Sequence, residues 1–289
     1  MVYLAARYYA AYTLLGYGFA KVMGAQFTVL DSQLAKPMGD VSGFWLTWYY
    51  FGYSAPYASL VAWAQITGAV LLCFRRTALA GALLLLPVMV NIVGIDVWVI
   101  RFPFDSGALR NAVYVLLALL LVVVFHARDL LRLLTVRRDD LVLLTKMPRL
   151  GFVVALLVTA GMVAYTAHEA DWLANVNNRD PTPIDGAWHV TVARPNDVAT
   201  PEWIYFEYNR AYMVVFGFPN GTTETHDFRV DPEAKTLKIA GEWLTAGSEV
   251  FDGHWDRNGD KMTLSGVWHN TAPIRMTLER KQMPVKDHQ

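Results

Sequence analysis

The sequence has few of the residues that build disulfides, metal centres and soluble surfaces. Cys73 is its single cysteine, which excludes an internal disulfide, a CxxC redox pair, a Cys-based zinc site and a Cys-ligated iron–sulfur cluster. Charged residues make up 17% of the 289 residues, against about 25% in an average soluble domain. A Gly-rich phosphate loop, a GxSxG motif and a nucleic-acid signature are also missing from the sequence. We therefore expect no metal and no nucleic-acid partner.

Hydrophobic residues are abundant, and charge is divided unevenly along the chain. They make up 54% of the sequence, and the mean hydropathy is +0.27. Residues 1–168 hold 13 Lys and Arg against 7 Asp and Glu, whereas residues 169–289 hold 12 against 18. An apolar, basic part followed by a more polar, acidic part predicts a membrane domain joined to a soluble domain.

Five segments of the first part are long and apolar enough to cross a bilayer. A hydrocarbon core of ~30 Å needs about 20 such residues in a helix. The runs are continuous, whereas a transmembrane β-barrel would show alternating segments of about ten residues. We therefore predict an α-helical membrane bundle over residues 1–168, with spans at 3–23, 57–74, 77–99, 110–126 and 150–168.

Basic residues cluster in two of the predicted loops. Arg75 and Arg76 lie in the turn between the second and third spans, and six more cations lie within 127–149. The positive-inside bias places both loops in the cytoplasm. We therefore expect a multi-pass protein of the cell (inner) membrane, with a cytoplasmic N-terminus and an extracytoplasmic region after His168.

In the second part, apolar and polar residues alternate with a period of two, as in β-strands. Residues 169–186 predict a linker rich in turn formers. Eight short alternating runs follow within 187–281, separated by turn signals and without a helical segment, which is typical of an antiparallel meander that closes into a small barrel or sandwich. Residues 282–289 form a tail. Core packing is the expected role of the tryptophans in this domain, with a ligand cavity as the alternative; they are Trp188, Trp203, Trp243, Trp255 and Trp268.

Polar side chains at membrane depth carry the best functional signal, because they are costly in lipid and usually face the interior of a bundle. Lys21 and Asp96 are the expected ion pair, and Asp105 with Arg101 or Arg110 is a second. Asn91 and Asp96 lie about 140° apart on an ideal α-helix, so we do not expect them to share a face. Anchoring at the interface is the alternative role. The candidate polar pocket consists of Lys21, Gln26, Gln65, Asn91, Asp96, Arg101 and Asp105.

Three stretches of the first part carry a family resemblance: RYYAAYTLLGYGFAKVMGAQF (7–27), AWAQITGAVLLCFRRTALAGALLLLPVMVNIVG (62–94) and HARDLLRLL (126–134). They resemble the DoxX-like integral membrane proteins, in particular the subset with a C-terminal β domain. The specific parts are YGFAKV with QF, and the helix end at FRRT. The resemblance implies a four-helix bundle core and a remote link to the membrane subunit of thiosulfate:quinone oxidoreductase.

The resemblance carries over four positions as family polar residues: Lys21, Gln26, Gln65 and Asn91. Two departures from the family pattern weaken a proton-coupled role. Gln65 stands where such proteins often have a glutamate, and it cannot ionise. The segment after Asn91 is longer here, so Asp96 and Asp105 are not carried over as family acids.

Three functions are compatible with these patterns. The absence of a complete catalytic constellation favours a non-catalytic membrane or complex-assembly component, whose β domain contacts a protein partner. The alternatives are a subunit of a quinone-linked oxidoreductase, and a binder of lipid or a small hydrophobic ligand. No cofactor is evident from the sequence, quinone is the candidate, and the lipid bilayer is the expected surrounding partner.

Overall fold

The structure, a computed structural model, describes residues 1–283 except 129, 132–148, 178–179, 196–198, 209, 211 and 271. The expected tail beyond residue 283 and most of the basic loop 127–149 lie outside the described residues. The chain divides into two compact units. The helical unit consists of Met1–Phe27 and Ser42–Ala174, and the barrel unit consists of Thr28–Val41 and Asn175–Gln289.

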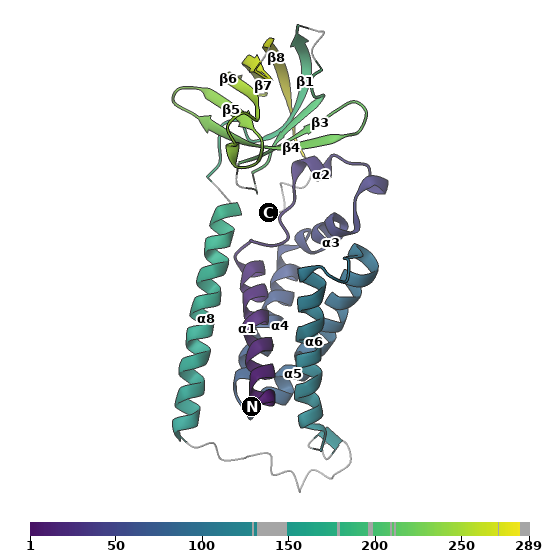
Figure 1. Cartoon of the computed structure of the whole chain (residues 1–289), viewed down its shortest axis with the longest axis vertical. Helices are drawn as coiled ribbons and strands as arrows, with labels where there is room; N and C mark the ends of the chain where they lie inside the picture. The colour runs from purple at the N-terminus through teal and green to yellow at the C-terminus, as the bar shows by residue number, and fades with distance from the viewer. Residues whose placement is uncertain are drawn as a thin grey trace. The chain divides into compact units, whose positions relative to one another are not determined.

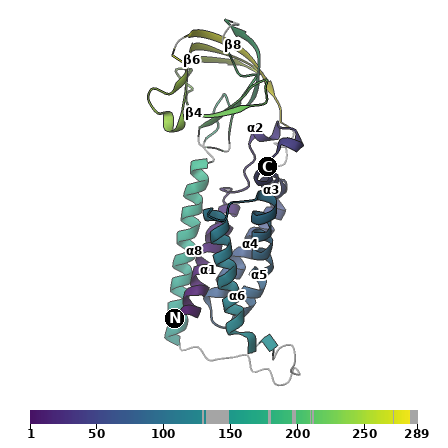
Figure 2. The same cartoon turned by 45° about the vertical axis from the view of Figure 1, so that its right-hand side comes forward.

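Four helices form the core of the helical unit, as predicted. They run side by side in both views (Figure 1 and Figure 2) and comprise α1 (Val2–Val22), α4 (Ala55–Cys73), α5 (Ala78–Gly94) and α6 (Gly107–Phe125). Small residues allow close crossing: a Cβ on Gly68 would lie 2.5 Å from Cγ of Leu85, and a Cβ on Gly81 would lie 2.7 Å from the carbonyl oxygen of Gly68. In lipid, such close backbone approach is a main source of helix association.

Among the described residues, four helices are long and apolar enough to cross a membrane: Ala55–Cys73, Ala78–Ile100, Gly107–Phe125 and Arg149–Ala174. They correspond to four of the five predicted spans. The fifth predicted span, 3–23, forms helix α1 of 21 residues, which at about 1.5 Å per residue is also long enough to cross. Its tyrosines, Arg7 and Lys21 make it more polar than the other four, and its crossing stays a prediction.

The last helix of this unit, α8 (Arg149–Asn177), is longer than expected. Residues 169–177 belong to this helix, whereas the sequence predicted a turn-rich linker from residue 169. The helix continues because Glu169–Asn177 contains neither glycine nor proline, and the first proline follows at position 181. α8 lies beside α1, where the rings of Tyr12 and Tyr165 stack with centroids 6.3 Å apart.

Short elements complete the two units. In the helical unit, α3 (Gly43–Gly52) follows a serine cap, and the π-helix η2 (Ile95–Ile100) extends α5. The hydroxyl of Ser42 accepts a hydrogen bond from the backbone N–H of Trp45, 3.4 Å away. The aromatic run that begins at Phe44 is therefore helical. In the barrel unit, α2 (Asp31–Leu34) and η1 (Met38–Asp40) precede the strands.

Eight antiparallel strands close into a barrel in simple sequence order, which confirms the predicted meander (Figure 1). The strands are β1 (Gly186–Arg194), β2 (Trp203–Phe206), β3 (Met213–Gly217), β4 (Thr223–Asp231), β5 (Thr236–Ala240), β6 (Glu249–Asn258), β7 (Lys261–Trp268) and β8 (Ala272–Lys281), with the short helix η4 (Glu242–Leu244) between β5 and β6.

Side chains fill the interior of the barrel, as expected for its size. Trp188, Trp255 and Trp268 belong to its buried core together with phenylalanines and aliphatic residues. Trp203 instead packs in a separate apolar cluster with Tyr205, and the side chain of Trp243 is outside the described part of the chain. Core packing is thus the role of three of the five tryptophans.

Candidate functional site

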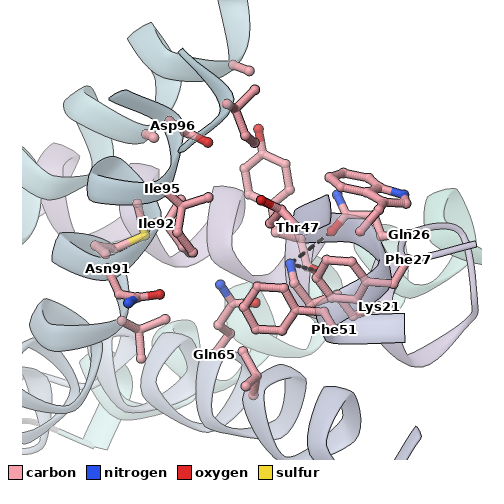
Figure 3. A pocket seen from close by; sticks show the side chains of 18 of the residues that line it. Lys21, Gln26, Phe27, Thr47, Phe51, Gln65, Asn91, Ile92, Ile95 and Asp96 are labelled. Atoms are coloured by element: carbon pink, nitrogen blue, oxygen red, sulfur yellow. Dashed lines mark hydrogen bonds between the residues drawn. The ribbon is translucent and has the colours of Figure 1, made fainter. Parts of the chain in front are cut away.

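A cavity of about 510 Å³ lies within the helical unit (Figure 3). Its wall is built by α1, α3, α4, α5, η2 and α6, together with Gln26 and Phe27 just after α1. The volume falls in the range of about 300–1,000 Å³ that is typical of small-molecule sites. We call it the bundle cavity.

The bundle cavity brings together five of the seven residues of the predicted polar pocket. Figure 3 shows Lys21 and Gln26 together on one side, Asn91 and Asp96 on the other, and the Gln65 carboxamide between Lys21 and Asn91. The other two predicted residues, Arg101 and Asp105, are exposed and do not line it.

The amino group of Lys21 forms hydrogen bonds with uncharged acceptors from α1 and the residues just after it. Its ammonium donates hydrogen bonds to Oε1 of Gln26 at 2.9 Å and to the carbonyl oxygen of Tyr17 at 3.2 Å. It also lies 5.4 Å from the centroid of the Phe27 ring and 5.6 Å from that of Tyr17, within the range of cation–π attraction.

The expected ion pairs are not formed between these described residues. Lys21 has no ion pair with Asp96, because Gln26, close to Lys21 in the sequence, occupies one of its donors while Asp96 lies on the opposite wall (Figure 3). Asp105 likewise has no ion pair with Arg101 or Arg110.

Asp96 reaches the cavity through an unusual helix. It is 9% exposed and belongs to η2, which winds as a π-helix. Asn91 belongs to α5, before the π-helix begins, and it also lines the cavity. That Asn91 and Asp96 do not share one face of the helix stays a prediction.

Gln65 has the most informative environment in the cavity. The residue is fully buried, and neither Oε1 nor Nε2 has a hydrogen-bond partner among the described residues. Its carboxamide points toward the centre of the cavity (Figure 3). A buried polar group without a partner costs about 1–3 kcal/mol. Both atoms are available to a molecule inside the cavity.

Aromatic rings of α3 and its surroundings build the apolar wall. Phe27 stacks on Phe51 with centroids 4.9 Å apart, and Phe44 stacks on Trp48 at 4.3 Å. Gly43 lets α3 approach η2, since a Cβ there would collide with the carbonyl oxygen of Val99. The sequence analysis did not predict the place of these aromatics in a cavity wall.

A second buried polar site lies in the barrel unit and was not predicted. Glu207 is 1% exposed, and its carboxylate accepts hydrogen bonds from the backbone N–H groups of Asp31 at 2.8 Å and Ser32 at 3.0 Å. Burial raises the pKa of Glu207 to about 7, although the hydrogen bonds from Ser32 oppose this shift. Burial and the neighbouring Glu207 also raise the pKa of Tyr205 to about 12. This contact attaches α2 to the barrel.

The described residues show no assembly of metal ligands. No three His, Cys, Asp or Glu side chains among them come close enough to hold an ion. Cys73 is buried in the core of the four helices, where its thiol lies 3.4 Å from the carbonyl oxygen of Ala69. The chemistry that the bundle cavity offers is therefore hydrogen bonding, one cation, one carboxyl group and an aromatic wall.

Comparison with known proteins gives one informative relative. The chain is 37% identical over 101 residues to the uncharacterized protein YwoB of Bacillus subtilis (strain 168). The match covers 35% of this chain and 61% of that protein, which is less than two thirds of its length. No family model matches the chain, and no solved structure matches it. The four apolar helices indicate a membrane protein.

Proposed function

We propose that the helical unit binds a small hydrophobic molecule with a polar head group in the bundle cavity. The observation that carries this proposal is the fully buried carboxamide of Gln65, whose donor and acceptor both lack a protein partner in the described structure. Such a group is costly in an empty apolar protein interior. A ligand that hydrogen bonds to it offsets this cost.

The cavity wall supports an amphipathic ligand over a purely apolar one. Residues such as Leu14, Val61 and Val115 offer apolar surface, while Lys21 and Gln65 offer hydrogen bonds. Ligand sites typically combine a mostly apolar lining with a few polar groups that fix orientation. Binding of this kind is compatible with a non-catalytic membrane component, the function that the sequence favours.

A quinone is the second candidate ligand. The stacked rings of Phe27 and Phe51 offer a flat apolar surface, and Lys21 and Gln65 offer donors for a carbonyl oxygen. In this alternative the chain is the membrane subunit of a quinone-linked oxidoreductase, which is also what the resemblance to DoxX-like proteins suggests. The four-helix core supports that resemblance.

The wider setting of the protein is also a proposal. We propose a multi-pass protein of the cell (inner) membrane, with the barrel unit outside the cytoplasm and available to a protein partner. The loop that contains Arg75 and Arg76 supports this orientation through the positive-inside bias.

Native mass spectrometry of the full chain, released directly from membranes, tests the binding proposal. We expect a defined small molecule to remain bound to the wild type and to a Leu120→Phe control, because Leu120 is an exposed residue of α6. Ala112→Phe should release it, because Ala112 lines the cavity from the same helix and is buried. A bare wild-type protein, or equal occupancy in both variants, would contradict the proposal, and a released quinone would favour the second candidate.

A further inference from the structure

Three observations define the head group that the bundle cavity would take, and this step rests on the proposed function. Lys21 brings a basic amino group to the cavity wall, and no carboxylate of the described residues lies within ion-pair distance of it. A charge in an apolar, low-dielectric interior is costly unless an opposite charge accompanies it. The described part of the chain does not supply that opposite charge next to Lys21.

The unused hydrogen-bond donors of the cavity wall indicate how many acceptor atoms the head group of the ligand carries. An ammonium has three donors, and the structure uses two of those of Lys21 for Gln26 and Tyr17. The two N–H groups of the Gln65 carboxamide remain without a partner in the described residues. Figure 3 shows the Gln65 carboxamide between Lys21 and Asn91, and the remaining donors of Lys21 and Gln65 suit a small group with two acceptor oxygens and one negative charge.

We propose that the ligand is an apolar carboxylic acid, whose carboxylate is held by Lys21 and Gln65. A phosphate group needs more donors and more positive charge than this wall offers, and phosphate sites commonly use arginine for that reason. The apolar body of the acid lies against the ring of Phe51 and the aliphatic side chains of α5 and α6. Asp96 lies on the opposite wall, away from Lys21.

Binding of dodecanoate, dodecanol and methyl dodecanoate to the full chain in lipid nanodiscs tests this assignment, with empty nanodiscs as the background. The three probes share the same chain, and only the acid carries a carboxylate. We expect the wild type to bind dodecanoate at least tenfold more tightly than the alcohol or the ester. Equal affinity for all three would overturn the carboxylate assignment while leaving the proposed function intact, whereas no binding of any probe would count against both.

Two charge-removing variants extend the test. Lys21→Met should abolish the preference for the acid while retaining binding of dodecanol, and Lys36→Met, which removes the same charge outside the cavity, should retain the preference. A Lys21→Met protein that still prefers the acid tenfold would overturn the role of Lys21. The wild-type comparison of acid with alcohol decides the proposal even if Lys21→Met does not fold.

Discussion

Replacing Gln65 by leucine should stabilise the protein without ligand and weaken its binding of ligand. Leucine has a similar size and brings no polar atom into the core of the bundle. It removes a carboxamide whose two polar atoms have no partner in the described structure, and each such group costs about 1–3 kcal/mol. The unfolded reference state in a micelle offers some partners of its own, so we expect a net gain of about 1–3 kcal/mol in the free energy of unfolding.

Cys73 provides a built-in probe for this measurement. It is the single cysteine of the chain and is 1% exposed in the core of the four helices. A thiol-reactive fluorophore therefore reports the opening of the bundle and not of the barrel. Thermal unfolding of wild-type and Gln65→Leu protein in detergent, after delipidation, gives the change directly.

Asn111→Leu is the matched control, because it makes the same chemical change at a satisfied amide. Asn111 donates to the hydroxyl of Tyr17 at 3.0 Å and accepts from the hydroxyl of Tyr9 at 2.7 Å. Loss of these two bonds should destabilise the bundle by about 1–2 kcal/mol. If Gln65→Leu destabilised the delipidated protein as much as Asn111→Leu does, Gln65 would be a structural residue and the reasoning from its unpaired atoms would be refuted.

Three further predictions concern packing, pH and orientation. Gly81→Ala should lower the stability of the bundle by about 1–3 kcal/mol, because its Cβ would lie 2.7 Å from the backbone oxygen of Gly68. Gly161→Ala should be neutral, because a Cβ at Gly161 would have no atom within 4 Å. The rate of Cys73 labelling distinguishes the two variants. Because burial raises the pKa of Glu207 to about 7 from 4.5, the folded state retains a proton that the unfolded state has lost, and barrel stability should fall by up to about 3 kcal/mol as the pH rises from about 4.5 to 7. Hydrogen exchange of β2 and β3 in the full chain should show this fall, and Glu207→Gln should remove it; an unchanged pH profile would contradict the shift. A reporter fused after Gln289 should be active outside the cytoplasm, and activity inside would reverse the proposed orientation.

Hydrophobic patterning predicted most of the fold. Continuous apolar runs predicted the membrane helices, and the alternation of apolar and polar residues predicted the barrel. Both predictions succeed because burial leaves a pattern of apolar residues that the local sequence shows directly. The end of α8 was missed because residues 169–177 are polar enough for a loop, and nothing in their local sequence requires one. Helix propensity and the lack of a glycine or proline favour the helical conformation of residues 169–177.

The site was predicted in part, through the cost of polarity at membrane depth. That cost singled out Lys21, Gln26, Gln65, Asn91 and Asp96, which the structure places around one cavity.

The remaining features depend on tertiary structure that no local pattern contains. Packing of α3 against η2 places aromatic residues of α3 in the cavity wall. Glu207 meets Asp31 across 176 residues of sequence, and an isolated glutamate at the end of a strand gives no sign of such a contact.

Photo-crosslinking tests the central claim, ligand binding in the bundle cavity, most directly. A dodecanoate probe with a diazirine near the end of its chain, added to the full-length protein in nanodiscs, labels whatever side chains surround it, and mass spectrometry locates them. We predict labelling of cavity residues such as Phe51 and Ala112 that excess unlabelled dodecanoate suppresses. Labelling confined to lipid-facing positions such as Leu157 on α8, without competition, would contradict the account.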